Sequence, residues 1–277
     1  MPSSSSVDIV KSMRVSTAFD YFQDIAGLHA DNLGAGIDHI KEEYGVAWIL
    51  MRVRIEIDRY AHLEEPLIIE TWPQPPKTLY DRDYLIRAES DGKILARSVS
   101  TWVLMDLAAH DIRKGKVFDY AYPIQETERA IDVKLRQLKA PGPLERIAEH
   151  PVRYSDIDYN LHVNNARYID LILDNYSLAF HQEYEIGAIE VNYINEIRPD
   201  ETLLISKAAY PAEDQAGNTA AEDPNGNTAA EDPNGNIALK CANGSVAASG
   251  PKEYIELSSA EDKRIAIKAA IEFRKRK

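Results

Sequence analysis

The sequence predicts an α+β fold in which one structural unit occurs twice. Residues 14–34 carry apolar side chains at helical spacing, and strand-like runs follow within residues 48–106. The same order of one helix and then antiparallel strands returns in residues 153–257. The halves also correspond in detail, because "VRIEID" before "EEPLIIE" parallels "VNYINE" before "DETLLIS". A helix buried against a curved antiparallel sheet is an α+β architecture, and two copies indicate an internal duplication.

The first half shows the clearest patterns. Its helix has an apolar face, and the strand after it alternates apolar with charged residues. The helical positions are Ala18, Tyr21, Phe22, Ile25, Ala26 and Leu28, and the strand positions are Met51, Val53, Ile55 and Ile57. Two more strands are expected in residues 79–90 and 93–106, joined by a tight turn at Asp91-Gly92.

The second half repeats this order with a longer entry to its helix. The expected helical face is Val163, Tyr168, Ile169, Leu171 and Ile172. Residues 188–208 read as strand, turn and strand, and residues 236–257 as a hairpin with Asn243-Gly244 at its tip. We therefore expect an N-terminal half at 1–110, a linker at 111–150 with a short helix at 124–132, and a C-terminal half at 151–277.

Composition excludes several classes of protein. The net charge of −13 argues against general nucleic-acid binding, and the basic end "FRKRK" is interpreted as a solvated C-terminus. No apolar run suits a membrane span, and the start lacks the pattern of a secretory signal, so we expect a cytoplasmic protein. The single cysteine, Cys241, excludes a disulfide framework within the chain and is given no catalytic role.

A nine-residue repeat interrupts the second half. "NTAAEDPNG" occurs at residues 218–226 and again, unchanged, at residues 227–235. Asp-Pro-Asn-Gly is turn chemistry, and the glycine stands at the wrong offset for a calcium loop. We interpret residues 213–236 as a surface insertion in a strand connection.

The segment "DIDYNLHVNN" precedes the second helix and has no counterpart in the first half. Asp158, Asn160 and His162 alternate, so in extended backbone their side chains would project to one side. A carboxylate, an amide and an imidazole around one point can activate water or attack directly, orient a carbonyl, and transfer a proton. The following helix N-terminus offers N–H groups to an oxyanion. For Asp158, Asn160 and His162, a polar loop with ordinary turn and cap bonds is the alternative. Asn164 or Asn165 is expected to be the N-cap.

Glu196 stands near the end of a strand in "EVNYINEI". On alternation alone it is predicted to be an exposed strand residue, so composition and spacing do not assign it a catalytic role.

The sequence resembles the acyl-acyl carrier protein thioesterases. "DYNLHVNNARYI" is similar to their signature D-x-N-x-H-V-N-N-x-x-Y-I, and "EVNYINEI" to their second catalytic segment. The resemblance extends over residues 19–257 and implies a tandem double hotdog fold, with a long helix wrapped by a curved sheet in each half. It implies Asp158, Asn160, His162 and Glu196 as the catalytic set. Plant members have a cysteine after the glutamate and an N-terminal transit segment, whereas this sequence has Ile197 and no such segment, so it resembles a bacterial type.

The resemblance implies hydrolysis of fatty acyl-acyl carrier protein to free fatty acid, without cofactor or metal. Three alternatives remain: an acyl-CoA thioesterase, a hotdog dehydratase or hydratase, and a non-catalytic acyl-binding protein. The implied partner is an acidic acyl carrier protein, and neither nucleic acid nor membrane is expected. The oligomeric state is left open, with a homodimer as one possibility. Because the chain is itself acidic, docking would need a local basic patch. The candidates are Arg113, Lys114, Lys116, Lys134, Arg136 and residues 274–277.

Overall fold

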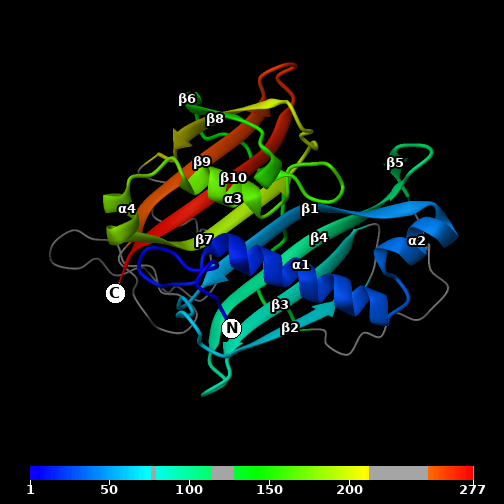
Figure 1. Cartoon of the computed structure of the whole chain (residues 1–277), viewed down its shortest axis with the longest axis horizontal. Helices are drawn as coiled ribbons and strands as arrows, with labels where there is room; N and C mark the ends of the chain where they lie inside the picture. Colours follow the sequence, from blue (N-terminus) through cyan, green and yellow to red (C-terminus); the bar gives the residue numbers. More distant parts are fainter. Residues whose placement is uncertain (76–78, 114–127, 212–248, 277) are drawn as a thin grey trace, which may run out of the picture.

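The computed structural model describes residues 1–75, 79–113, 128–211 and 249–276. Within them, ten strands form one antiparallel sheet (Figure 1). From one edge to the other the order is β2 (Leu67–Pro73), β3 (Tyr80–Ala88), β4 (Ile94–Asp106), β1 (Val46–Ile57), β7 (Tyr184–Tyr193), β10 (Ile265–Lys275), β9 (Ser249–Ser259), β8 (Thr202–Ala209) and β6 (Glu145–Pro151), and the short β5 (Asp111–Ile112) pairs with β4.

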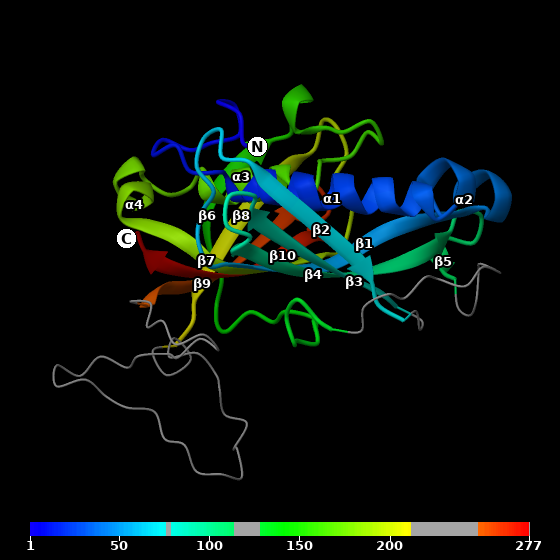
Figure 2. The same cartoon turned by 90° about the horizontal axis from the view of Figure 1, so that it is seen from below.

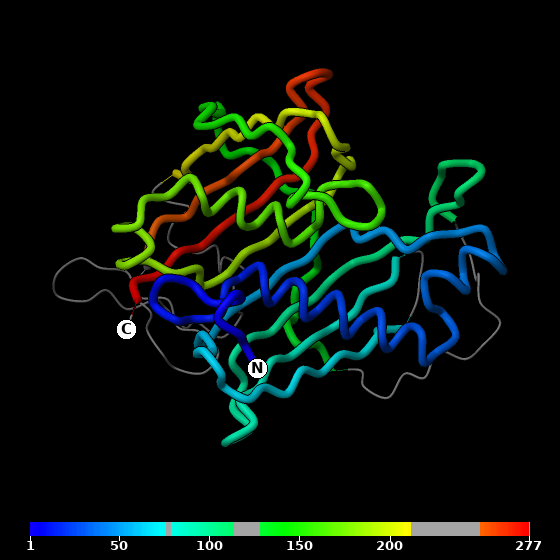
Figure 3. Tube along the Cα trace, in the orientation of Figure 1, coloured from blue at the N-terminus to red at the C-terminus, as the bar shows by residue number. Residues whose placement is uncertain are grey.

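The two halves join through their central strands. β1 pairs with β7 in antiparallel register, from Arg52 opposite Asn192 to Glu56 opposite Ala188. The trace in Figure 3 shows the first half, blue to cyan, side by side with the second, green to red. The duplicated α+β arrangement predicted from the sequence is therefore present as one continuous sheet.

Helices cover one face of this sheet (Figure 2). They are α1 (Val15–Asn32), α2 (Ile37–Tyr44), α3 (Arg167–Leu173) and α4 (Leu178–Glu183), with a 3-10 turn η1 (Tyr154–Asp156) before α3. The buried side of α1 holds Ala18, Phe19, Phe22 and Ala26, the i, i+4 pattern expected for a helix on a core. Residues 128–144 cross the opposite face of the sheet (Figure 2).

The helix of the second half is shorter than its sequence pattern suggests. Val163 precedes it, in an isolated bridge with Ile157, and α3 has only seven residues. The Asn175 side chain donates to the Leu171 carbonyl, and the Ser177 hydroxyl accepts from the backbone N–H of Phe180 to start α4. Asparagine and serine compete with helix bonds in this way, so the predicted helix ends at Leu173 and a separate short helix, α4, follows it.

The segment expected as a linker is partly sheet. β6 begins at Glu145, inside the expected range 111–150, and pairs with β8. The described part of the short helix predicted at 124–132, residues 128–132, is not helical. Cys241, the insertion at 213–236 and the hairpin tip Asn243-Gly244 lie outside the described residues.

The prediction of a solvated C-terminus is wrong. Residues 265–275 form β10, a central strand between β7 and β9. Phe273 is buried, Arg274 forms an ion pair with Glu185, and Arg276 forms one with Asp8. The period-two pattern of apolar residues before "RKRK" was the signal of a strand, and the basic residues obscured it. No helix among the described residues combines the length and apolarity that crossing a membrane requires.

Candidate functional site

The predicted site segment forms a tight hairpin turn, so the expectation of extended backbone is wrong. The N–H of Asp158 donates to the carbonyl of His162 at 2.9 Å, and the N–H of Leu161 donates to the carbonyl of Asp158 at 3.1 Å. Leu161 has a φ of 63°, the left-handed conformation that closes a three-residue hairpin loop. A leucine rarely adopts it, and such strain clusters at functional sites.

The Asp158 carboxylate shapes this turn. Its Oδ1 accepts the backbone N–H of Asn160 at 2.8 Å and that of His162 at 3.4 Å. Aspartate commonly bonds to the backbone two residues ahead, which favours a turn over a strand. The side-chain amide of Asn160 has no hydrogen-bond partner among the described residues.

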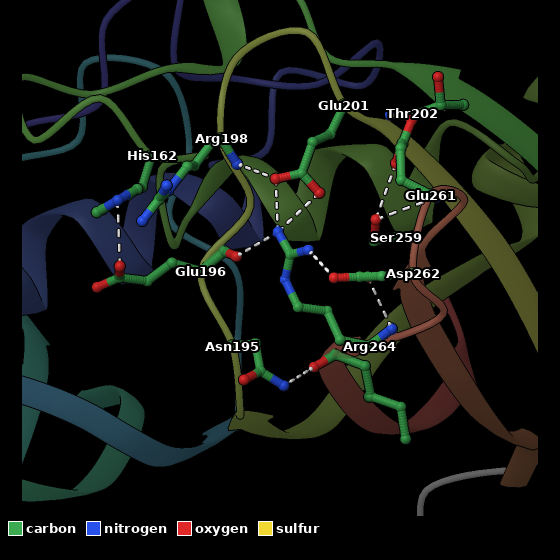
Figure 4. A network of polar contacts seen from close by, with 11 residues as sticks. His162, Asn195, Glu196, Arg198, Glu201, Thr202, Ser259, Glu261, Asp262 and Arg264 are labelled. Atoms are coloured by element: carbon green, nitrogen blue, oxygen red, sulfur yellow. Dashed lines mark hydrogen bonds and ion pairs between the residues drawn. The ribbon is translucent and has the colours of Figure 1, made fainter. Parts of the chain in front are cut away.

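His162 and Glu196 come together as a pair. Nε2 of His162 lies 3.1 Å from Oε2 of Glu196, and the side chains are 27% and 58% exposed (Figure 4). Glu196 is the third residue after β7, and His162 ends the hairpin turn. The fold thus brings two of the four predicted residues into direct contact from separate segments.

A network around Arg264 holds the loop that carries Glu196 (Figure 4). Nη2 of Arg264 donates to the Glu196 carbonyl at 3.3 Å and to both carboxylate oxygens of Glu201, at 2.5 and 2.7 Å. The Asn195 side chain donates to the Ile265 carbonyl at 2.7 Å. The turn between β9 and β10 therefore fixes the backbone at Glu196, a role that the sequence did not reveal.

The two asparagines at the helix entry have different tasks. Asn164 Oδ1 accepts the N–H groups of Ala166 at 2.8 Å and Arg167 at 3.3 Å and so closes the turn before α3, but the N-cap residue of α3 is Ala166, not Asn164 or Asn165 as expected. These bonds occupy N–H groups that the sequence analysis offered to an oxyanion. Asn165 instead donates to Gln23 of α1 at 3.0 Å, which ties the site to the first half.

Asp156 holds the chain in place just before α3. It is 1% exposed and accepts from Nε2 of His150 at 2.7 Å, from the N–H of Arg153 at 2.8 Å and from Nε of Arg167 at 2.9 Å. Burial alone would raise the pKa of this carboxyl, but the bonds from His150 and Arg167 outweigh it and lower the pKa. Asp156 is therefore an ionised structural anchor.

All four predicted residues line one cavity of about 830 Å³ between the halves. The first half supplies one flank of α1, the start of β1, and parts of β2, β3 and β4. Small residues of α1 leave space above the sheet, and a Cβ atom at Gly27 would meet no atom within 4 Å. The cavity volume lies in the range of small-molecule sites.

Asp20 of α1 also lines this cavity and was missed by the sequence analysis. Surrounding protein atoms and the carboxylates of Asp24 and Asp170 raise its pKa to about 6. A carboxylate on a helix flank gives no signal in a single sequence, because most are solvated. The described residues contain no cluster of histidine, cysteine, aspartate and glutamate suited to a metal ion.

The raised pKa of Asp20 predicts that this residue lowers the stability of the fold by an amount that depends on the pH. Because the pKa of the Asp20 carboxyl is higher in the folded state, the folded protein binds more protons than the unfolded chain between about pH 4 and about pH 6. The free energy of unfolding therefore falls as the pH rises through this range. Asp20→Asn should raise the free energy of unfolding at neutral pH by up to about 1 kcal/mol after discounting for solvent screening, and the melting temperature should rise with it. The effect should vanish near pH 4. An equal effect at both pH values would contradict this.

Comparisons with known proteins agree with this architecture. The family model "Acyl-ACP thioesterase N-terminal domain" matches residues 3–120, and the model "Acyl-ACP thioesterase C-terminal domain" matches residues 144–232. The oleoyl-acyl carrier protein thioesterase of Coriandrum sativum is 26% identical over 71% of this chain and 58% of its own length. The palmitoyl-acyl carrier protein thioesterase of Gossypium hirsutum is 28% identical over 64% of this chain and 44% of its own length. The chain thus spans only about half the length of these relatives.

Solved structures share the fold. An acyl-ACP thioesterase from Bacteroides thetaiotaomicron aligns with a TM-score of 0.75 at 21% identity, covering 98% of this chain and 94% of that one. The 12:0-ACP thioesterase from Umbellularia californica aligns with a TM-score of 0.68 at 18% identity, covering 99% and 91%. The predicted tandem hotdog fold is confirmed. With both of its halves matched by the family's models, the chain belongs to the acyl-ACP thioesterases.

Proposed function

We propose that the protein hydrolyses the thioester of fatty acyl-acyl carrier protein and releases free fatty acid. The observation that carries this proposal is the contact between His162 and Glu196 at the rim of a cavity that could hold an acyl chain. Membership of the family supports the same reaction. The relatives' names mention oleoyl and palmitoyl thioesters.

The geometry favours water as the nucleophile. We assign to the His162 Nε2 a proton that is donated to Glu196, which leaves Nδ1 free to accept a proton from water. The resulting hydroxide attacks the thioester carbon, and the imidazolium returns the proton to the departing thiolate. Asp158 orients the turn, since one of its oxygens already accepts two N–H groups. We assign to the amide of Asn160, which has no hydrogen-bond partner among the described residues, the donation of a hydrogen bond to the carbonyl oxygen of the substrate.

A single turnover in water labelled with heavy oxygen tests this order of events. Direct attack by water puts the label into the first fatty acid released. If Asp158 or Glu196 attacked first and water opened the mixed anhydride at the carboxyl carbon of the enzyme, that acid would carry an unlabelled oxygen from the enzyme, and the label would enter the protein. A mixed anhydride that water opens at the acyl carbon would also label the acid, and trapping with hydroxylamine during turnover distinguishes it from direct attack.

Two alternatives remain within reach of one assay: an acyl-CoA thioesterase and a non-catalytic acyl-binding protein. Thiol release from acyl-acyl carrier protein and from acyl-CoA, measured side by side, should show a higher kcat/KM for the protein substrate. The reverse preference would identify an acyl-CoA thioesterase. Binding of acyl chains without thiol release would identify a binding protein.

The basic patches suggested by the sequence are poorly placed for docking. Arg274 lies near the far end of β10 from the Glu196 loop, about 30 Å away at 3.3 Å per residue, and forms an ion pair with Glu185. Arg113 forms an ion pair with Asp106. Lys134 and Arg136 belong to the segment on the face opposite the helices (Figure 2). Lys114, Lys116 and Lys277 lie outside the described residues.

We propose instead that the acidic carrier docks beside Arg198, an exposed residue near His162 (Figure 4). Arg198→Glu should raise KM for acyl-acyl carrier protein several-fold at low salt, because rim charges steer association. It should leave KM for the uncharged acyl-pantetheine almost unchanged. The matched control is the double variant Lys134→Glu and Arg136→Glu, which should bind both substrates normally. If this double variant raised KM for acyl-acyl carrier protein and Arg198→Glu did not, the docking surface would lie on the opposite face of the sheet.

The cytoplasm as the site of action and a homodimer as the working form are further parts of this proposal. The plant relatives are named as chloroplastic. Cell fractionation with an antibody against the chain tests the first, and light scattering tests the second.

A further inference from the structure

One cation lies in the apolar face of β3. The residues of this strand that face the helices are Tyr80, Arg82, Tyr84 and Ile86, and all are buried. Arg82 pairs with Ser100, which is opposite Val53 on β1. Arg82 is only 6% exposed, so its guanidinium belongs to the interior between the sheet and α1.

Among the residues that the structure describes, the charge of Arg82 has no anionic partner. Its Nη1 contacts Nδ1 of His29 at 2.9 Å and Oγ1 of Thr71 at 3.2 Å. No carboxylate of the described residues lies within 4.0 Å of it, whereas the nearly buried Arg274 and Arg276 each form ion pairs. Partial burial and the Arg82 charge lower the pKa of His29, which keeps that ring neutral near neutral pH. Arginine is rarely buried without an anion or a full set of acceptors.

Arg82 also lines the cavity that contains the proposed catalytic residues. Together with Gln74 and Tyr80, each 9% exposed, it belongs to the buried lining that the first half supplies, whereas Glu196, which the second half supplies, is 58% exposed. Three strand spacings separate β7, which leads to Glu196, from β3, about 14 Å in all. An acyl chain bound at the catalytic pair and extended under α1 would therefore approach Arg82 with its far end.

We propose that Arg82 binds an oxygen at the far end of the acyl chain, so that the preferred substrates are thioesters of acids that carry a hydroxyl or carboxylate remote from the thioester. The inference rests on the proposed thioesterase function. A methyl end at this place would surround the guanidinium with hydrocarbon and remove the water that solvates it. An oxygen would accept its free N–H groups, and a charged donor favours that bond.

The test compares acyl-acyl carrier proteins of equal chain length that end in a methyl, a hydroxyl or a carboxylate group, over a series of lengths. At the best length the wild-type protein should show a kcat/KM at least about tenfold higher for an oxygenated chain, the factor expected of one hydrogen bond to a charged group. Whichever oxygenated chain, hydroxyl-ended or carboxylate-ended, gives the higher kcat/KM identifies the group that Arg82 binds. Arg82→Met should abolish the preference, and Arg82→Lys should keep part of it.

Arg87→Met is the matched control, because Arg87 lies on the opposite face of β3 and pairs with Glu70. It should keep the wild-type preference. Faster hydrolysis of methyl-ended chains at every length by the wild type, or a preference that survives Arg82→Met, would overturn the inference and leave the thioesterase function intact. If no thioester is cleaved, the proposed function fails; calorimetric binding of the free oxygenated and methyl-ended acids to the wild type then decides separately whether Arg82 recognises the oxygen.

Discussion

His162→Ala should lower kcat for thioester hydrolysis by roughly a hundredfold or more while the melting temperature stays close to that of the wild type. A general acid/base typically contributes this factor, and His162 lies in a partly exposed hairpin turn rather than in the core. Steady-state kinetics and a thermal melt check both halves of the prediction. A variant that turns over at the normal rate would remove His162 from the mechanism, and a variant that unfolds would make it a structural residue.

Glu196→Gln is the companion variant. It preserves shape and can still contact Nε2, but it cannot stabilise an imidazolium by charge. We expect a loss of kcat somewhat smaller than that of His162→Ala, with KM little changed. The double variant should be no worse than His162→Ala alone, because residues that act as a unit are not additive. Additive losses would show that the two side chains act independently.

Asp156→Ala should lower the free energy of unfolding by about 2–4 kcal/mol, the largest stability effect that we expect from a substitution near the site. The variant removes a buried carboxylate and leaves His150, Arg153 and Arg167 without their shared acceptor. Because the pKa of Asp156 is lowered in the fold, its stabilisation is present above the ordinary carboxyl range and is lost as the pH falls through the folded pKa. The difference from wild type should therefore shrink in acid.

Asp170→Ala is the control for that experiment. Asp170 pairs with the same Arg167 at 3.1 Å but is 22% exposed, so its removal should cost less than about 1 kcal/mol. Urea denaturation of both variants at neutral and acidic pH gives the comparison. Equal losses for the two variants would contradict the assignment of Asp156 as the anchor.

Local pattern was enough to predict the duplicated α+β arrangement, whereas the tandem hotdog fold was predicted from the family resemblance. The strands of the first half, the turn at Asp91-Gly92 and the paired halves follow from alternation and turn chemistry, which are properties of neighbouring residues. β10 was missed although its apolar residues alternate, because a terminal run of positive charge suggested solvent. The early end of α3 depends on the side-chain bonds of Asn175 and Ser177, which compete with a helix only in a given geometry.

The site was harder to predict, because its parts meet only in the folded chain. The spacing of Asp158, Asn160 and His162 identified the segment but not its turn, which depends on backbone bonds to the Asp158 carboxylate. Glu196 needed the resemblance, since alternation alone made it a surface residue. Arg264 is remote in sequence and gave no local signal. Arg82 did give one, because it is a cation between apolar residues at alternate positions of β3.

Hydrolysis of purified acyl-acyl carrier protein by the full chain tests the central claim most directly. Free carrier thiol and free fatty acid should appear in equal amounts and at the same rate with the wild-type protein. Both should fall together by roughly a hundredfold or more with His162→Ala. Absence of product with the wild type, or equal rates for the two proteins, would contradict the account.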